Sequence, residues 1–173
     1  EACNYYLMAI SKGHSISMLH YASMLYKGSC IEKNLPEAAK YFKMAADNGN
    51  IISMNQYGSM LLKGEGVEIN KKEAFKYFKE AADTCDICGC KNLISMYESG
   101  EIKDMDQNEI NRYYKIIENS NDESNLFIQN DDQNSPERDQ KMTINELKYE
   151  ADNGDVESMF KYAQLVENGD ADE

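Results

Sequence analysis

Residues 17–50 read SMLHYASMLYKGSCIEKNLPEAAKYFKMAADNGN, and residues 53–86 read SMNQYGSMLLKGEGVEINKKEAFKYFKEAADTCD. The second stretch repeats the first after 36 residues. The residues that recur are mostly small or aromatic: Gly28 with Gly64, Ala38 with Ala74, Tyr41-Phe42 with Tyr77-Phe78, and Ala45-Ala46 with Ala81-Ala82. A constant period of this length is the signature of a repeat array.

The same period extends in both directions along the chain. Gly100 and Tyr113-Tyr114 follow one period later, and Tyr5-Tyr6 precedes Tyr41-Phe42 by one period. We therefore predict a single array over 1–173. Its expected parts are 3–16 as the end of a preceding repeat, 17–52 and 53–88 as repeats, 89–121 as a degenerate repeat, 122–157 as a drifted repeat with an acidic polar insertion, and 158–173 as the start of a further repeat.

Each unit is predicted to hold two helices, which we name helix A and helix B. Helix A of the first full unit, over about 17–26, places apolar residues on one face and ends at Gly28. Helix B begins at a capping pair in each unit, where a polar side chain meets a Glu three residues later: Asn34 with Glu37, Asn70 with Glu73, and Asp106 with Glu109. The expected fold is all-α, a right-handed α/α superhelix (solenoid) of stacked antiparallel helix pairs. We expect Gly58 to lie where helices A and B cross, so a larger residue would overpack the crossing.

The region after the third unit is harder to assign. Residues 119–140 are polar and acidic, with one apolar island at Leu126 to Ile128. We interpret the island as a degraded helix A, followed by an inserted loop over about 129–138. The next helix B begins either at Asp139 or at Thr143, where Glu146 supplies a capping partner.

These motifs resemble the Sel-one-like repeat, a relative of the tetratricopeptide repeat. The second unit has the pattern in full: Gly58, Gly64, Gly66, Val67, Ala74, Tyr77, Phe78, Ala81 and Ala82. The first unit has Cys30 in place of the second loop glycine, and the third has Ile102 there. The resemblance implies an adaptor that binds other proteins. Similar proteins act in signalling and in membrane-associated quality control, and some bacterial relatives are secreted factors that meet host proteins.

Composition excludes several classes of partner. The net charge of −13 repels phosphate backbones, so nucleic acid is not expected as a partner. No apolar stretch is long enough for a membrane span.

The chain begins at Glu1 with no signal-peptide pattern, so we expect its natural N-terminus to be missing. The odd cysteine count favours a reducing, cytoplasmic setting.

Three candidate chemical sites are assigned to structure instead. Cys85 and Cys88 would supply only two of the four ligands of a structural zinc site, so no metal and no cofactor are expected. Gly64-Glu65-Gly66 lacks the strand and the Lys-Ser/Thr of a phosphate loop. His14 and His20 have no nucleophile or carboxylate partner at a periodic position. We therefore predict that the chain is not an enzyme.

A curved stack of helix pairs has a concave face lined by its A helices. Helix A positions that do not point into the core are predicted to bind a protein or peptide there: His20, Ser23, Tyr26, Lys27, Gln56, Ser59, Leu62, Lys63, Asn92, Ser95 and Glu98. Tyr26 and Leu62 are the expected apolar anchors, and the uncapped ends of the array are a second place where association could occur. The alternative function is a regulatory or targeting segment of a longer enzyme, such as a kinase.

Overall fold

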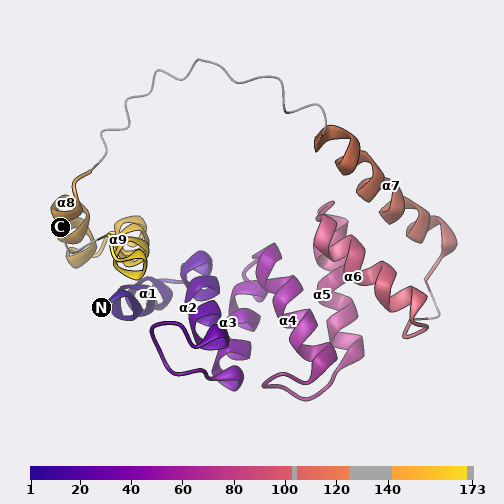
Figure 1. Cartoon of the computed structure of the whole chain (residues 1–173), viewed down its shortest axis with the longest axis horizontal. Coiled ribbons are helices and arrows are strands. Elements are labelled where there is room, and N and C mark those ends of the chain that lie inside the picture. The colour runs from indigo at the N-terminus through magenta and orange to yellow at the C-terminus, as the bar shows by residue number, and fades with distance from the viewer. Residues whose placement is uncertain (103–104, 125–141, 171–173) are drawn as a thin grey trace. The chain divides into compact units, whose positions relative to one another are not determined.

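The structure is a computed structural model that describes residues 1–102, 105–124 and 142–170. Among these residues the regular secondary structure is helical, with no strand, and turns and loops join the helices (Figure 1). The helices are α1 (Ala2–Ser11), α2 (Ser15–Lys27), α3 (Leu35–Asp47), α4 (Ile51–Lys63), α5 (Lys71–Asp83), α6 (Ile87–Glu98), α7 (Gln107–Ser124), α8 (Ile144–Asp152) and α9 (Val156–Asn168). The prediction of an all-α fold of helix pairs is confirmed.

Helix A of the first full unit ends where the sequence predicts. It is α2, which starts two residues before the expected Ser17 and ends at Lys27. Gly28 adopts a left-handed conformation with φ of 75°, and its N–H donates to the Met24 carbonyl at 2.8 Å. Glycine suits this position because a Cβ atom disfavours positive φ.

Two of the predicted caps of helix B form, but the donor to the Glu carboxylate differs from the prediction. The side chains of Asn34 and Asn70 accept from the N–H groups of Glu37 and Glu73, at 3.1 and 3.2 Å. Each Glu carboxylate then accepts from the asparagine side-chain amide, and not from the cap backbone as the sequence predicts. The backbone N–H groups of Asn34 and Asn70 donate to the Leu25 and Leu61 carbonyls, at 2.9 and 3.0 Å, so the asparagine side-chain amide is the donor that meets the carboxylate.

The caps of the third and fourth units have different outcomes: the third differs from the prediction and the fourth forms a capping box. Asp106 accepts from the N–H of Asn108 at 3.3 Å, so the predicted side-chain pairing with the Glu109 N–H is replaced. Thr143 accepts from the Glu146 N–H, and the Glu146 carboxylate accepts from the Thr143 N–H at 2.8 Å, which completes a capping box. Helix B of the fourth unit therefore begins after Thr143. The alternative start at Asp139 and the expected helix at Leu126–Ile128 lie outside the described residues.

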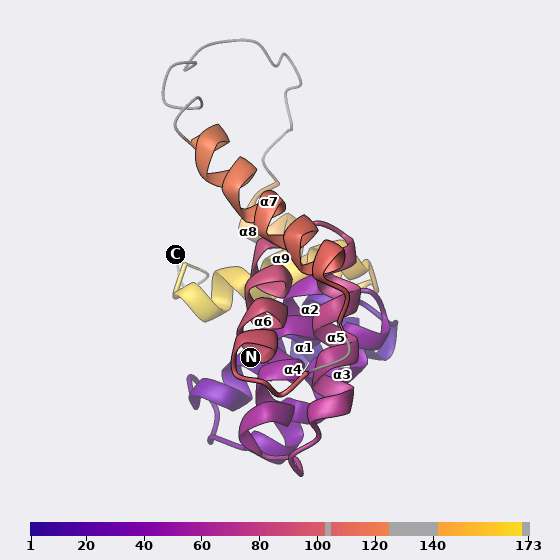
Figure 2. The same cartoon turned by 90° about the vertical axis from the view of Figure 1, so that its right-hand side faces the viewer.

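The chain divides into two compact units, which we describe separately. Unit 2 holds most of α4, together with α5, α6 and α7. The helix crossing at Gly58 is tight, because a Cβ atom there would lie 2.6 Å from Cε1 of Phe78. Figure 2 shows α7, an 18-residue helix, extending beyond the 12-residue α6.

Unit 1 holds α1, α2, α3, α8 and α9, with the start of α4 and residues 65–67. Within it, α9 packs against both α8 and α1, as the yellow and indigo helices of Figure 1 show. The helix from the C-terminal part of the chain therefore covers the face of α1 that the repeat pattern leaves open. Their shared core includes Tyr5, Tyr6 and Ala9 of α1 with Tyr162 and Ala163 of α9.

Helices α9 and α1 together form one repeat, which we call the composite repeat. The α9 residues SMFKYAQLVENG align without a gap with SMLHYASMLYKG of α2, so α9 is a helix A. Tyr162 and Tyr5 form an edge-to-face pair with ring centroids 4.8 Å apart. The equivalent pair Tyr21–Tyr41 lies at 5.0 Å, and a third such pair in unit 2 lies at 5.2 Å. Helix A of the composite repeat thus comes from the end of the chain and helix B from its beginning.

Two cysteines occupy backbone positions that favour glycine. Cys30 and Cys85 both have φ of 64°. Cys30 is the residue that replaces the loop glycine of the repeat, represented by Gly66 in the next unit, and Cys85 is equivalent to Gly49. Gly66 and Gly49 have φ of 72° and 83°, so the backbone conformation of both turns is kept after the glycine is lost.

Candidate functional site

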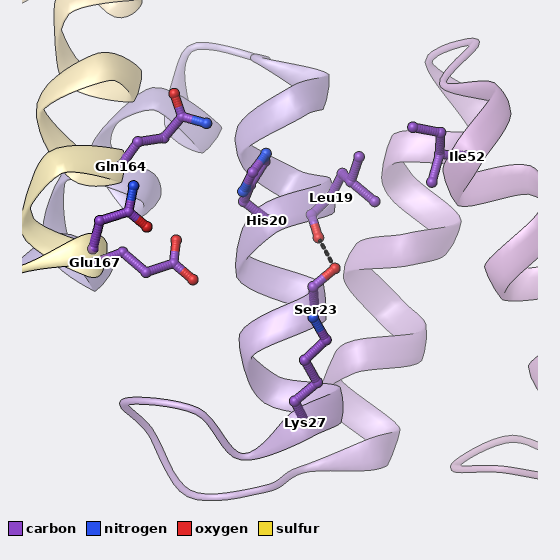
Figure 3. A pocket seen from close by; sticks show the side chains of 8 residues that line it. Leu19, His20, Ser23, Lys27, Ile52, Gln164 and Glu167 are labelled. Carbon is purple, nitrogen blue, oxygen red and sulfur yellow. Dashed lines mark hydrogen bonds between the residues drawn. The ribbon is translucent and has the colours of Figure 1, made fainter.

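A hollow of about 360 Å³ lies between α2 and α9 in unit 1 (Figure 3). Residues of α2, of α9 and of the first turn of α4 line it: Leu19, His20, Ser23, Lys27, Ile52, Gln164, Glu167 and Asn168. His20, Ser23 and Lys27 share one side of α2 because residues three and four apart are neighbours on a helix. All three belong to the predicted binding face, and the structure brings them together.

The α9 residues of the hollow were missed by the sequence prediction. Gln164, Glu167 and Asn168 align with Ser23, Tyr26 and Lys27 of α2, the positions already assigned to the binding face. The alignment of the repeats therefore already marked these α9 positions as part of a binding face. It could not show that α9 lies next to α2, because more than a hundred residues separate these helices in the chain.

His20 forms part of the wall of the hollow and is half-buried. Its ring stacks on Tyr6, with centroids 5.7 Å apart, and meets the edge of Phe160 at 5.2 Å. Burial lowers the pKa of His20 below its ordinary value, Glu167 opposes this change and Lys27 adds to it. His20 is therefore neutral near pH 7 and offers one hydrogen-bond donor and one acceptor.

Glu167 is held by a buried tyrosine of α1. The hydroxyl of Tyr6, whose side chain is fully buried, donates to Oε2 of Glu167 at 2.8 Å. Burial, followed by the bond to Glu167, raises the pKa of Tyr6, so its hydroxyl stays protonated and continues to donate. Figure 3 shows Glu167 reaching from α9 towards α2, where His20 and Ser23 lie.

Leu19 and Ile52 give the hollow an apolar edge. Ile52 is 58% exposed, which is high for a large apolar side chain beside a concavity. The Ser23 hydroxyl donates to the Leu19 carbonyl at 2.9 Å, so its lone pairs remain available as acceptors. The site thus combines an apolar edge, amides, a neutral imidazole and one charge of each sign.

Tyr26, an expected anchor, does not line the hollow. Its hydroxyl donates to Glu65 at 2.8 Å, and its ring meets Phe42 of α3 edge-to-face at 6.3 Å. Both contacts lie within unit 1. Replacing Tyr26 would therefore affect packing within its own repeat as well as any partner.

The remaining predicted residues lie in unit 2, on α4 and α6. The Asn92 amide donates to Asn55 at 3.1 Å, and Glu98 accepts from the Tyr114 hydroxyl at 2.6 Å. Gln56 and Lys63 are exposed. Three others complete the set: Ser59, Leu62 and Ser95. None of the seven lines the hollow of unit 1, so their role in binding stays a prediction.

One expectation about the histidines is wrong. Nδ1 of His14 lies 2.7 Å from the Ser17 hydroxyl, so His14 does have a hydroxyl partner. Ser17 is fully buried at the start of α2, and the equivalent Ser53 and Ser158 are buried too. A buried hydroxyl at a repeated packing position has no access to a substrate, so we assign the pair to structure.

The cysteines and the helices give no further site. Within the part of the chain that the structure describes, no three His, Cys, Asp or Glu side chains are grouped to hold a metal ion. Cys90 is buried, and burial raises its pKa to about 11, which makes its thiol unreactive near neutral pH. None of the described helices is both long and apolar enough to cross a bilayer.

Comparisons with known proteins agree with this architecture. The family model described as Sel1 repeat matches residues 15–50 and 51–83. A Sel1 repeat protein from Oxalobacter formigenes has a similar crystal structure, with a TM-score of 0.62 and 25% sequence identity over 68% of this chain and 49% of that chain. Sel1 repeats are detected, and no catalytic domain is identified.

A second solved structure is similar over almost the whole chain. It is a protective antigen of uropathogenic Escherichia coli that displays an SLR fold, with a TM-score of 0.64 and 17% identity over 98% of this chain and 38% of that one. At this identity the likeness concerns the fold alone. The chain spans about half or less of the length of these two proteins. No curated protein sequence matches it.

Proposed function

We propose that this chain, which is a Sel1-repeat helical scaffold, binds a segment of a partner protein in the hollow between α2 and α9. One observation carries the proposal. The hollow is lined by equivalent positions of two A helices, Ser23 and Lys27 of α2 with Gln164 and Asn168 of α9. A binding face built from the same register of successive A helices is what a stack of helix pairs presents.

The size and chemistry of the hollow support a protein segment as the ligand. A volume of about 360 Å³ lies near the lower end of ligand sites, which span roughly 300–1,000 Å³. It suits one or two side chains of a segment. The apolar edge at Leu19 and Ile52 can receive an aliphatic chain, and the amides of Gln164 and Asn168 can pair with main-chain groups.

A peptide selection tests the proposal. A random peptide library is selected against the immobilised chain, and the Kd of enriched peptides is measured by fluorescence anisotropy. Ser23→Phe, which fills the hollow, should weaken binding by about 2 kcal/mol, the scale of an interface hot spot. Met44→Ala on α3 is the control, since Met44 is exposed and does not line the hollow.

Met44→Ala should leave the Kd within about twofold, which is ordinary for a residue outside an interface. Two outcomes would overturn the proposal. One is a library with no enrichment over the bare support. The other is enriched peptides whose Kd is unchanged by Ser23→Phe while circular dichroism shows that the variant is folded.

A further inference from the structure

The hollow contains one carboxylate, and that carboxylate has no cation. Among the residues that the structure describes, no Lys, Arg or His lies within ion-pairing distance of Glu167. Glu167 is half-buried. A partly desolvated charge is costly when it is unpaired, so this position favours a ligand that brings a positive charge.

The carboxylate is also oriented. The Tyr6 hydroxyl donates to Oε2 of Glu167 at 2.8 Å, and this leaves Oε1 for another donor. Tyr6 cannot move easily, because its ring is fully buried and stacked on His20. An acceptor held in place by a buried donor loses little freedom on binding, which favours affinity.

The groups around Glu167 leave room for a cation. His20 is neutral near pH 7, so it neither neutralises the carboxylate nor repels a positive charge. Lys27 lies on α2 on the other side of the hollow and is exposed to solvent. The equivalent A-helix positions to Glu167 are Tyr26, Leu62 and Glu98, so in unit 1 the carboxylate at this position comes from α9 and not from α2.

We infer that the hollow binds a basic side chain of the partner segment, with its cation on Glu167 and its aliphatic stem against Leu19 and Ile52. Lys and Arg both carry a long apolar stem below a charged end, which matches a hollow lined by both an apolar edge and a carboxylate. The chain's net charge of −13 also attracts cationic segments during encounter. The inference rests on the proposed function and specifies what the site recognises.

Three short peptides test the inference by NMR. They are acetyl-Ala-X-Ala-amide with Lys, norleucine or Glu at X, each titrated to roughly millimolar concentrations while the His20 ring and Glu167 amide signals are followed. Norleucine keeps the aliphatic stem and lacks the charge. The lysine peptide should bind about tenfold more tightly than the norleucine peptide, and the Glu peptide should bind least.

Two matched variants identify the groups responsible. Glu167→Gln keeps the shape of the side chain and should remove the preference for Lys over norleucine. Lys27→Met removes the competing cation of the hollow and should strengthen binding of the lysine peptide by about two- to threefold. Both should retain the wild-type amide spectrum outside the hollow, which shows that they are folded.

The outcomes separate the inference from the proposed function. If Lys27→Met weakens binding and the Glu peptide binds best, the hollow takes an anion and the inference is wrong. Equal binding of the Lys and norleucine peptides, or no response to any of the three, also overturns it. A library-selected peptide that is blocked by Ser23→Phe but indifferent to Glu167→Gln would leave the proposed function standing and reject the basic side chain.

Discussion

The composite repeat of α9 and α1 and the continuous repeat of α2 and α3 have the same core and a different chain path. In both, a helix A tyrosine meets a helix B tyrosine edge-to-face, at 4.8 Å for Tyr162–Tyr5 and 5.0 Å for Tyr21–Tyr41. The continuous repeat connects its helices through a short loop, in which the Asn34 N–H donates to the Leu25 carbonyl. The composite repeat has no such loop and is closed by contacts between residues far apart in the chain.

Those closing contacts are specific. The Tyr6 hydroxyl of α1 donates to Glu167 of α9 at 2.8 Å. Two further bonds hold α1 to the residues just before α9: Lys12 donates to the Gly154 carbonyl at 2.9 Å, and the Tyr5 hydroxyl donates to Asp152 at the end of α8 at 2.7 Å. The comparison teaches that a repeat is defined by the positions of the core residues along its two helices. The way in which the chain connects those helices can differ. The cost of a distant connection grows only slowly with its length, so burial of matching surfaces can outweigh it.

The largest expected effect is the loss of the central aromatic ring. Tyr6 is fully buried in the composite repeat, and Phe42, its equivalent, is 2% exposed in the continuous one. Tyr6→Ala and Phe42→Ala should each lower the free energy of unfolding by about 3–5 kcal/mol, through lost burial and the cavity that remains. Urea denaturation measures both.

Tyr6→Phe is the control for the ring. It keeps the packing and loses only the hydrogen bond to Glu167, so it should cost about 1 kcal/mol. A Tyr6→Ala variant as stable as the parent chain would contradict the packing of α9 on α1, and the composite repeat with it.

Overpacking should have the next largest effect. Ala163 of α9 and Ala22 of α2 occupy the same register position, and both are fully buried. Ala163→Leu and Ala22→Leu should each destabilise the protein by about 1–3 kcal/mol. Ala163→Leu should also release α8 and α9 to limited proteolysis while α2 and α3 remain protected. Lys161→Leu, at an exposed position of α9, should change neither property.

Double-mutant cycles sharpen the comparison further. We expect a coupling energy of about 0.5–1.5 kcal/mol between Tyr5 and Tyr162, the range of an edge-to-face aromatic pair. The cycle for Tyr21 and Tyr41 should give the same value within about 0.5 kcal/mol. Each cycle uses Leu substitutions and urea denaturation. A coupling near zero in the composite repeat alone would show that its rings do not meet.

The smallest expected effect is a pH dependence at the contact between the two repeats. The pKa of His20 is lowered in the folded protein, mainly by burial, so folding favours its neutral form. Its contribution is therefore complete above the unfolded pKa of about 6.5 and is lost as the pH falls through the lower folded pKa. The wild-type Tm should fall more between pH 7 and pH 5 than that of His20→Gln. Parallel curves for the two proteins would contradict the buried environment of His20.

Much of the fold could be predicted from residues that act locally. Gly28 ends helix A because a left-handed turn is needed there, and Asn34 and Asn70 begin helix B because they cap it. The comparison of repeats also placed Cys30 and Cys85 at glycine positions, and both have positive φ. The exact capping bonds could not be predicted, because the backbone N–H groups of Asn34 and Asn70 bond to carbonyls of the preceding helix A, which is a contact outside the capping motif.

The candidate site could be predicted only in part. The side of α2 that carries His20, Ser23 and Lys27 follows from helical spacing. The role of Glu167 does not, because it depends on which helix lies next to α2. Tyr26 illustrates the converse: its register position is on the binding face, yet it pairs with Glu65 and Phe42 of unit 1.

By itself, the sequence determined the period, the end of the first helix A at Gly28, the asparagine caps of two B helices, and the small and aromatic core residues that recur in them. These properties depend on interactions within a few residues, or on the spacing of 3.6 residues per turn. Only the tertiary structure decided that α9 is the helix A of α1, and that Gln164 and Glu167 face α2. The physical reason is that every helix A of the array offers nearly the same packing surface. Local sequence can define such a surface, but the choice of its partner depends on the burial of the whole unit.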